Sequence, residues 1–483
     1  MQYKRPLLSL LTAVALQWQG SALAQSEFNL PDLGTSASQA LSIEKEQAIG
    51  DVMMMQIRAG AGFIQDPVLD EYVSSLGNKL VANADDVRFP FKFFWLKNPD
   101  INAFAFYGGH VGVHTGLLAQ SDNESQFASV LGHEIAHVTQ RHIARRLQNQ
   151  KDNSALTVAG MIAGILATIV APDAGMAILS ANSTQSALNN LSHSRKAEQE
   201  ADRFGMKTLK NAGFDPYASS EFLSKLAEQV RYKNKPPAFL LTHPLPETRI
   251  SDVRLRAEQY EKVYVPSSLN FALAKARVLA RYQYEPKIAE QFFRSNLERS
   301  SSLDNRDLEY GLALSLLDQK KLKESEAILK KLRSEDPNNL FYIDAQTDLL
   351  IAKGQAKEAV TLLSSFHDLR PNNQVITLNL ANAAIEAKDF ELALQVLKVF
   401  ALEKPEHNLA KQLLTKVYEE QNNKAAFHEA KADLLSQYGA YTKAADEIQK
   451  ALNHVEDSEE IKQQRLKALL SQYRQMQKAL AKL

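Results

Sequence analysis

Hydrophobic and polar positions divide the chain into two parts of different character. From about residue 26 to 261, strand and helix patterns are mixed, whereas from about 269 onward Ala, Leu, Lys, Glu and Gln dominate and predict helices throughout. Residues 263–268, Val-Tyr-Val-Pro-Ser-Ser, interrupt the helical patterns and predict a linker. We therefore expect two folded parts, residues 25–262 and 263–483, in an α+β protein that is mostly helical.

The second part repeats with a fixed period. Pro337, Pro371 and Pro405 stand 34 residues apart. Apolar and small positions keep the same spacing in register with the prolines: Leu329, Leu363 and Leu397; Leu332, Phe366 and Phe400; Ser325, Ala359 and Ala393. A 34-residue helix-turn-helix period is typical of tetratricopeptide repeats, which stack into an α-solenoid. Residues 271–297 predict a degenerate first unit, and residues 439–452 predict the second helix of a further unit.

The N-terminus has the pattern of a secretory signal. Lys4 and Arg5 precede a short apolar run at residues 6–16, and Ala22-Leu23-Ala24 forms a small-x-small cleavage pattern. Residues 1–24 therefore predict a cleavable signal peptide, with a mature chain that begins near Gln25. The sequence contains no cysteine, so we expect neither a lipid anchor after the cleavage site nor a thiolate metal ligand. These features together predict a location in the periplasm.

The overall charge argues against a nucleic-acid partner. Basic and acidic residues both number 56, and removal of the signal leaves 54 basic residues against 56 acidic ones. A neutral chain has no global field that would attract a polyanion.

One helical segment carries the residues of a metal site. Apolar residues recur near a spacing of 3.6 around it, at Phe127, Val130, Leu131, Ile135 and Val138. His133 and His137 are four residues apart, so they project from one helix face and can occupy two corners of a zinc tetrahedron. Glu134 then lies beside the metal, where it can act as the general base. We expect one Zn²⁺ per chain.

The third ligand comes from later in the sequence. A metzincin would need glycine and histidine where this chain has Gln140 and Ile143, so that class is excluded. We interpret His142, which lies five residues after His137, as structural or solvated.

Residues 194–202, Ser-Arg-Lys-Ala-Glu-Gln-Glu-Ala-Asp, offer a carboxylate ligand. Glu198 and Asp202 share one helix face, so Glu198 can complete the site while Asp202 bonds a ligand histidine. Glu200 points away from that face, although the chemistry alone leaves it open as the ligand.

These motifs together resemble the zinc proteases of the HtpX and CAAX-prenyl-protease group. Residues 102–105 and 108–118 are similar to the strand pair that precedes the catalytic helix in that family, and the resemblance covers about residues 45–255. It implies a zincin-type domain with Glu198 as the third zinc ligand. A signal peptide followed by a protease and then repeats is similar to the BepA-like group of periplasmic proteases. That similarity implies outer-membrane β-barrel precursors and the β-barrel assembly machinery as partners.

The segment His-Pro-Leu-Pro-Glu-Thr-Arg, residues 243–249, bears on the control of the site. In BepA-like proteins the histidine that matches His243 is implied to be a fourth zinc ligand that keeps the protease latent. A fourth protein ligand would exclude the water that catalysis needs. A surface-loop histidine is the alternative. Arg249 is a candidate for oxyanion stabilisation or for an ion pair with Glu247.

Two further segments have candidate contacts. The edge near residues 102–105 can take an extended substrate by strand addition, or it can be a buried structural strand. Residues 155–171 form a run of 17 uncharged residues. It predicts a helix that packs over the active site or makes peripheral membrane contact through 155–180, and a membrane span is the alternative. The function that follows is a periplasmic zinc endopeptidase with a chaperone-like role. The alternative is a chaperone or adaptor scaffold with a latent or vestigial protease.

Overall fold

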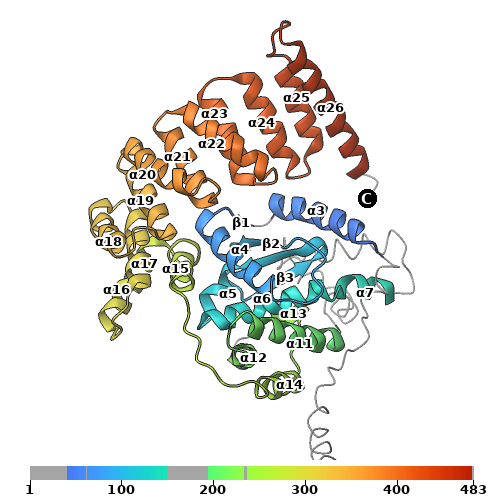
Figure 1. The fold of residues 1–483 in the computed structure, drawn as a ribbon, viewed down its shortest axis with the longest axis vertical. Helices are drawn as coiled ribbons and strands as arrows, with labels where there is room; N and C mark the ends of the chain where they lie inside the picture. Colours follow the sequence, from blue (N-terminus) through green and yellow to red (C-terminus); the bar gives the residue numbers. More distant parts are fainter. Residues whose placement is uncertain (1–40, 61, 150–193, 233–236, 481–483) are drawn as a thin grey trace, which may run out of the picture.

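The computed structural model describes residues 41–60, 62–149, 194–232 and 237–480 (Figure 1). The predicted signal peptide, residues 1–24, and the predicted membrane-contact segment, residues 155–180, lie outside these ranges. None of the helices within them is long and apolar enough to cross a bilayer. The predicted fold class, a mostly helical protein with a protease part followed by a helical solenoid, is confirmed.

A small four-stranded sheet forms the centre of the first part. Its strands are β1 (Phe63–Ile64), β2 (Lys92–Leu96), β3 (Ala103–Phe106) and β4 (His110–His114). Their order is β1-β2-β4-β3, with β2 and β4 parallel and the other pairs antiparallel. β4 is buried along its whole length, which explains why its polar ends are histidines rather than charged residues. Among the residues that the structure describes, β3 forms one edge of the sheet.

Helices cover the sheet and place one helix, α6 (Glu124–Thr139), in the core. Asn123 begins α6 because its side chain accepts a hydrogen bond from the Gln126 backbone N–H. The Phe127 ring stacks on Trp95 of β2 at 5.9 Å between centroids, which joins the helix to the sheet. The helices around this core are α3 (Ile43–Gly60), α4 (Pro67–Val81), α5 (Thr115–Gln120) and α7 (His142–Asn149).

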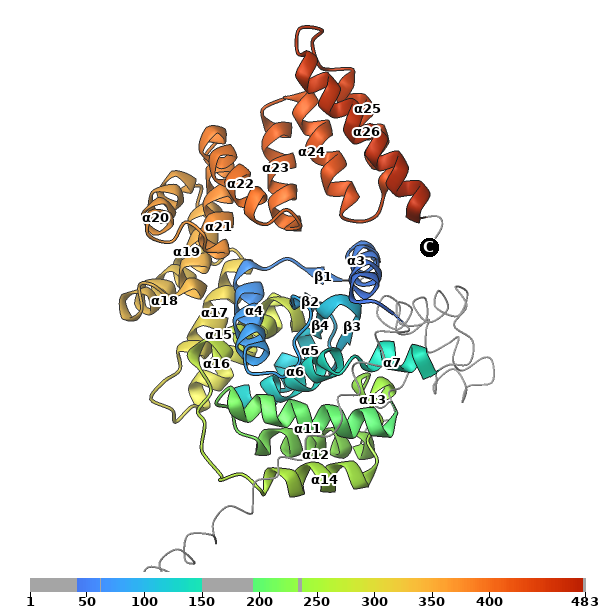
Figure 2. The ribbon, with the colours of Figure 1, turned by 45° about the vertical axis from the view of Figure 1, so that its right-hand side comes forward.

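A second layer of helices lies on the other side of α6. It consists of α11 (Arg195–Asn211), α12 (Tyr217–Tyr232), the short α13 (Phe239–Thr242) and α14 (Glu247–Ala257). α11 and α12 both pack on α6, and Figure 2 shows α11, α12 and α14 stacked below it. The residues of the predicted linker, 263–268, contain no helix or strand.

The second part is a solenoid of paired antiparallel helices. Pro337, Pro371 and Pro405 lie in the turns between successive pairs, and the repeated leucines are buried without exception. The helices are α15 (Leu269–Val278), with the π-helix η2 (Leu279–Gln283), α16 (Pro286–Arg299), α17 (Arg306–Asp318), α18 (Leu322–Glu335), α19 (Leu340–Ala352), α20 (Ala356–Leu369), α21 (Gln374–Glu386), α22 (Phe390–Glu403), α23 (Asn408–Glu420), α24 (Lys424–Ser436), α25 (Tyr441–Leu452) and α26 (Glu460–Leu480).

One prediction for the solenoid is wrong. The sequence predicts residues 439–452 as the second helix of a unit, but α25 occupies a first-helix position. First helices begin at Arg306, Leu340, Gln374 and Asn408, and the next step of the period falls at the start of α25. α24 already provides the second helix of the preceding unit, so α25 opens a new pair with the longer α26.

The solenoid begins against α4 and is fixed there by buried ions. Arg277 of α15 bonds Asp66, the N-cap of α4, at 2.6 Å and Asp344 of α19 at 2.7 Å. It also donates to the Tyr310 hydroxyl, and one apolar core runs without interruption from the sheet into the first helices of the solenoid. An ion group of this kind favours one docking geometry, because a change in that geometry would separate Arg277 from two buried carboxylates.

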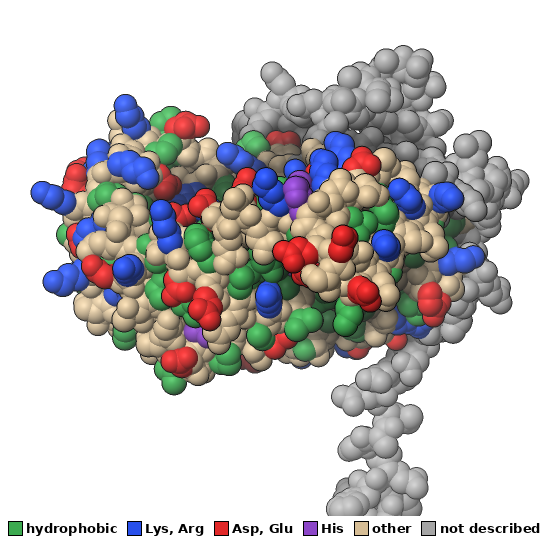
Figure 3. Space-filling view, turned by 90° about the horizontal axis from the view of Figure 1, so that it is seen from above, with side chains coloured by type: hydrophobic (Ala, Val, Ile, Leu, Met, Phe, Trp, Pro, Cys, Tyr) green, Lys and Arg blue, Asp and Glu red, His purple; other side chains and the backbone are tan. Residues whose placement is uncertain are grey.

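The far end of the solenoid returns to the first part through a few polar contacts. Arg58 of α3 donates to Gln437, Gln65 to Asn408, and Lys92 pairs with Glu406 at 2.5 Å. α24–α26 accordingly arch over α3 in Figures 1 and 2. Seen from this end, acidic and basic side chains are mixed over the surface (Figure 3), so the face has no single-sign field.

Candidate metal centre

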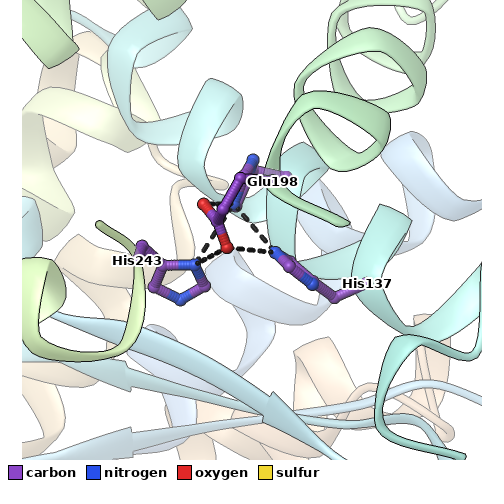
Figure 4. A group of neighbouring side chains, drawn as sticks. His137, Glu198 and His243 are labelled. Carbon is purple, nitrogen blue, oxygen red and sulfur yellow. Dashed lines mark hydrogen bonds and ion pairs between the residues drawn. The ribbon is translucent and has the colours of Figure 1, made fainter. Parts of the chain in front are cut away.

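Four side chains from three segments of the chain meet beside the sheet. His133 and His137 come from α6, Glu198 from α11, and His243 directly follows α13. The His133 and His137 Nε2 atoms are 3.0 Å apart, and His133 Nε2 lies 3.3 Å from His243 Nδ1. The Glu198 carboxylate lies 3.4 Å from His137 Nε2 and 3.1 Å from His243 Nδ1. Figure 4 shows His137, Glu198 and His243 pointing toward one another.

The arrangement of these donors fits a tetrahedral metal ion. With metal–ligand bonds of about 2.0–2.1 Å, neighbouring ligand atoms of a tetrahedron are separated by about 3.3 Å. His133 Nε2 lies 3.0 Å from His137 and 3.3 Å from His243, and Glu198 Oε1 lies 3.4 Å from His137 and 3.1 Å from His243, all close to this value. The other Glu198 oxygen, Oε2, lies 3.5 Å from His133 Nε2. The four donor atoms lie within 4.8 Å of one another, and all four residues are buried. Three imidazole nitrogens with one carboxylate oxygen form a donor set suited to a divalent transition ion.

Two glycines bring the helices close enough for Glu198 to reach α6. A Cβ at Gly205 would lie 3.0 Å from the His133 Cα, and one at Gly132 would lie 3.2 Å from the Gly205 carbonyl oxygen. Ser194 starts α11 by accepting a bond from the Ala197 N–H, so that Glu198 falls in its first turn. Asp202 follows one turn later on the same face.

Each histidine of α6 is oriented through its second ring nitrogen. Asp202 lies 3.0 Å from His133 Nδ1, as the sequence predicts for a residue behind a ligand. His142 lies 2.8 Å from His137 Nδ1 and 3.0 Å from a Glu200 oxygen, and Arg145 pairs with that same oxygen. His142 is therefore buried in a relay to His137 and not solvated. Glu200 faces away from the donor cluster but supports it through this relay.

Arg249 pairs with the two carboxylates of α11, and its predicted role in oxyanion stabilisation stays a prediction. Its guanidinium makes paired bonds to Asp202 at 2.7 and 2.8 Å and lies 2.5 Å from Glu198. The predicted ion pair with Glu247 is wrong, because Glu247 is exposed at the start of α14 whereas Arg249 is buried against α11. Arg249 also donates to the Pro244 carbonyl, which ties the chain after His243 to the carboxylates.

Electrostatics in the cluster favour a divalent cation. The formal charges of Glu134, Glu198, Asp202 and Arg249 sum to two negative units when the histidines are neutral, which a divalent ion would balance. Burial works to raise the pKa of Glu198, but His243 and Arg249 hold it well below its usual range. Burial alone would lower the pKa of His133. The carboxylates of Asp202 and Glu198 outweigh burial and raise the pKa of His133 to about 9.

Glu134 and His243 face each other. Glu134 Oε1 lies 3.4 Å from His243 Nε2, and both side chains are about 1% exposed. Burial raises the pKa of Glu134, as a general base requires if it is to accept a proton near neutral pH. The Phe239 ring stacks on the His243 ring at 4.3 Å between centroids and holds it toward the cluster.

The fold and this centre define a class of protein, the metallopeptidases. Residues 67–257 match the model of peptidase family M48, and residues 350–409 match a tetratricopeptide-repeat model. The mitochondrial metalloendopeptidase OMA1 of Bos taurus is 36% identical over 154 residues, covering 30% of this chain and 28% of its own. The chain is a metalloendopeptidase, and its His, His, Glu and His cluster could hold a metal ion.

Longer relatives identify the particular family. The beta-barrel assembly-enhancing proteases of Escherichia coli and Shigella flexneri are 38% identical over 482 residues, which covers 99% of this chain and 98% of theirs. A putative beta-barrel assembly-enhancing protease of Vibrio cholerae is 39% identical over 425 residues, 88% of each chain. The chain belongs to the beta-barrel assembly-enhancing protease family.

Sequence reasoning missed four residues of the centre: Gly132, Gly205, Phe239 and Glu200 in its supporting role. Gly205 had a signal, because a glycine inside a predicted helix often marks a close helix contact. The contact of Phe239 with His243 and the relay from Glu200 through His142 depend on which segments meet in space. No local sequence pattern predicts such meetings.

Proposed function

We propose that this chain is a periplasmic zinc endopeptidase that is held latent by His243 and acts on outer-membrane β-barrel precursors. The observation that carries the proposal is the set of four buried donors within 4.8 Å of one another, with Glu134 beside them. When bound, zinc supplies Lewis acidity that polarises a carbonyl and makes water acidic enough to lose a proton near neutral pH. His133, His137 and Glu198 would hold the ion, one per chain.

The protein residues have separable tasks. Glu134 takes the proton from the attacking water on Oε1 and passes it to the leaving amine. Asp202 keeps the proton of His133 on Nδ1, so that Nε2 presents its lone pair to the site. Arg249 neutralises Asp202 and part of Glu198, which keeps both carboxylates ionised in a buried environment.

His243 occupies the position that a substrate or water would need. Its Nδ1 lies with the other donors while its Nε2 lies 3.4 Å from the Glu134 carboxylate, so one ring obstructs both the fourth position and the base. We therefore infer a latent enzyme in which departure of His243 exposes the base and the open position together.

The proposed partners are inferred from the similar proteins and the solenoid, and the proposed location is inferred from the N-terminal pattern. Proteins named for β-barrel assembly enhancement match nearly the whole chain, which supports a role with β-barrel precursors and with the assembly machinery. The solenoid supports this role because stacked repeats present an extended surface to other proteins. The signal-like N-terminus supports the periplasm. Contact of residues 155–180 with a membrane stays a prediction.

A chaperone or adaptor function is the second candidate. The observation that favours it is His243 itself, since a site closed by four protein ligands is inert while it stays closed. A Glu134→Gln chain separates the two candidates: assembly of β-barrel proteins supported as well as by the wild type would favour the scaffold.

The testing experiment combines metal stoichiometry with proteolysis of casein by the full chain. We expect one zinc per chain in the wild type, Glu134→Gln and His243→Ala. Casein hydrolysis should be low in the wild type, absent in Glu134→Gln and raised in His243→Ala. A wild type that binds no zinc would overturn the proposal, and so would a zinc-loaded His243→Ala chain that is no more active than the wild type.

A further inference from the structure

Arg141, in the turn between α6 and α7, is a buried residue with an unusual backbone conformation. It is 2% exposed, and its φ of 53° lies in the left-handed region that residues other than glycine rarely adopt. Its backbone N–H donates to the Val138 carbonyl of α6, and its carbonyl accepts the Arg145 N–H of α7. The backbone of Arg141 therefore sets the direction in which α7 leaves α6.

This turn determines where His142 lies, because His142 is the first residue of α7. His142 Nδ1 lies 2.8 Å from His137 Nδ1, and His142 Nε2 lies 3.0 Å from a Glu200 oxygen. For His137 to present the lone pair of Nε2 to a metal ion, its Nδ1 must carry the proton and donate this N–H to His142. A displacement of the turn would therefore weaken the bond that orients a metal ligand.

The side chain of Arg141 connects this turn to the N-terminal helix α3. Its Nε donates to a Glu46 oxygen at 2.8 Å, and its Nη2 donates to that same oxygen. Nη2 also donates to the Leu41 carbonyl, at 2.6 Å. The Arg141 side chain is 0% exposed and the Glu46 side chain 5% exposed, so water cannot replace either partner. A shift of the turn would separate two buried opposite charges, which is costly.

Helix α3 is itself packed tightly against the sheet. A Cβ at Gly50, one turn after Glu46, would lie 2.0 Å from the first carbonyl oxygen of the 3₁₀-helix η1 (Tyr107–Gly109), which leads into β4. Met54 of α3 and Leu147 of α7 also belong to one buried apolar cluster. The ion pair therefore holds the turn after the histidine-bearing helix against a rigid part of the fold.

We propose that Arg141 is a positioning residue of the metal centre, whose ion pair with Glu46 fixes the turn that presents His142 to His137. This role rests on the proposed zinc site and adds a support that reaches the site from the N-terminal helix. Arg141 is not one of the donors, so it acts only through His142. Loss of the ion pair should lower zinc affinity about tenfold, the lower end of the range for residues behind a metal ligand, since one more residue intervenes.

The test uses the full-length chain with the double change Arg141→Gly and Glu46→Leu. The double change removes both charges, so no unpaired ion is left in the core, and glycine adopts a φ of 53° without strain. Zinc affinity is measured by competition with a chromophoric chelator. The visible absorption of the Co²⁺-loaded chain reports ligand geometry. We expect about tenfold weaker zinc binding and shifted Co²⁺ bands. Wild-type zinc affinity in this variant would overturn the proposal.

Glu46→Gln is the milder variant, which keeps the test decisive if the double change does not fold. It preserves the shape of the side chain but replaces a charged acceptor with a neutral one, whose hydrogen bonds are about half as strong. We expect zinc affinity to fall about two- to threefold, with a smaller shift of the Co²⁺ bands in the same direction. Affinity and bands equal to those of the wild type would overturn the proposal.

Arg277→Met is the matched control, because Arg277 is also buried between the chain's carboxylates but lies at the base of the solenoid. It should lower Tm while zinc affinity and the Co²⁺ bands stay as in the wild type. Zinc binding weakened as much as in the double variant would show an effect of general stability and would overturn the proposal. A wild-type chain that binds no zinc would overturn the proposed function as well, whereas the other negative results overturn this inference alone.

Discussion

Gly205→Ala is the sharpest probe of how the fold builds the metal centre. A Cβ at this position would lie 3.0 Å from both the His133 Cα and N, and 3.1 Å from the Gly132 carbonyl carbon. These are backbone atoms of α6, so they cannot rotate aside as a flexible side chain would. The two helices must separate by at least about 0.4 Å to reach ordinary contact.

A separation of that size matters because Glu198 and Asp202 are carried on α11 while the histidines stay on α6. Metal sites tolerate ligand displacements of only about 0.2 Å. We expect zinc affinity to fall about 10- to 100-fold, the range found when supporting residues of metal sites are changed. Such a loss corresponds to about 1.4–2.7 kcal/mol of binding free energy. Helix propensity acts in the opposite direction, since alanine favours the helix by about 1 kcal/mol.

The measurement is zinc affinity by competition with a chromophoric chelator, together with Tm of the metal-free chain. Gln199→Ala, at an exposed position of the same helix, is the control and should bind zinc like the wild type. The expected result is weakened zinc binding by Gly205→Ala with little change in Tm. Wild-type affinity in Gly205→Ala would refute the argument that close packing of α6 and α11 positions Glu198.

Three further predictions concern other parts of the molecule. Glu200→Gln should lower zinc affinity about tenfold by weakening the relay to His137, and unchanged affinity in the chelator assay would contradict this. Arg277→Met should destabilise the chain by about 3–5 kcal/mol in urea unfolding, because Asp66 and Asp344 lose their buried cation; a loss below about 1 kcal/mol would show that the ion group is dispensable. Glu290 has its pKa lowered to about 2, first by a bond from Lys321, so its stabilisation is present above the unfolded-state pKa and is lost as the pH falls toward 2. Glu290→Gln should therefore cost at most about 1 kcal/mol at neutral pH, and its deficit should shrink between about pH 5 and pH 3 in urea titrations. A deficit that is constant with pH would exclude the ionic explanation.

Much of the fold could be predicted because local patterns determine it. A helix alone places His133 and His137 on one face, so their spacing is enough to predict it. Stacking of like units alone explains the 34-residue period, so the period is enough to predict a solenoid. Glu198 and Asp202 share a face for the same reason. At residues 439–452 the proline that marks the earlier turns is replaced by Gly439, 34 residues after Pro405, so only the period itself indicates that α25 is a first helix.

The contacts between distant segments could not be predicted in the same way. The sequence predicts only a neighbouring partner for Arg249, Glu247, whereas in the fold Arg249 lies beside α11 and is buried with Glu198 and Asp202, two carboxylates that need a cation. His142 was expected to be structural or solvated because it is off the ligand face of α6. The helix ends at Thr139, and the turn at Arg141, with a positive φ of 53°, redirects the chain so that His142 returns to His137.

The return of the solenoid to α3 has a consequence for the number of repeats. An open solenoid can gain or lose a unit at its free end, since each unit contacts only its neighbours. Here Tyr441 of α25 reaches Met55, and Gln437 reaches Arg58, across nearly the whole sequence. The solenoid must therefore span the distance from α4 to α3, and the size of the protease part determines how many units it needs. Insertion or deletion of one unit would leave the last helices misaligned with α3. The contact with α3 therefore constrains the number of repeats that this architecture can have.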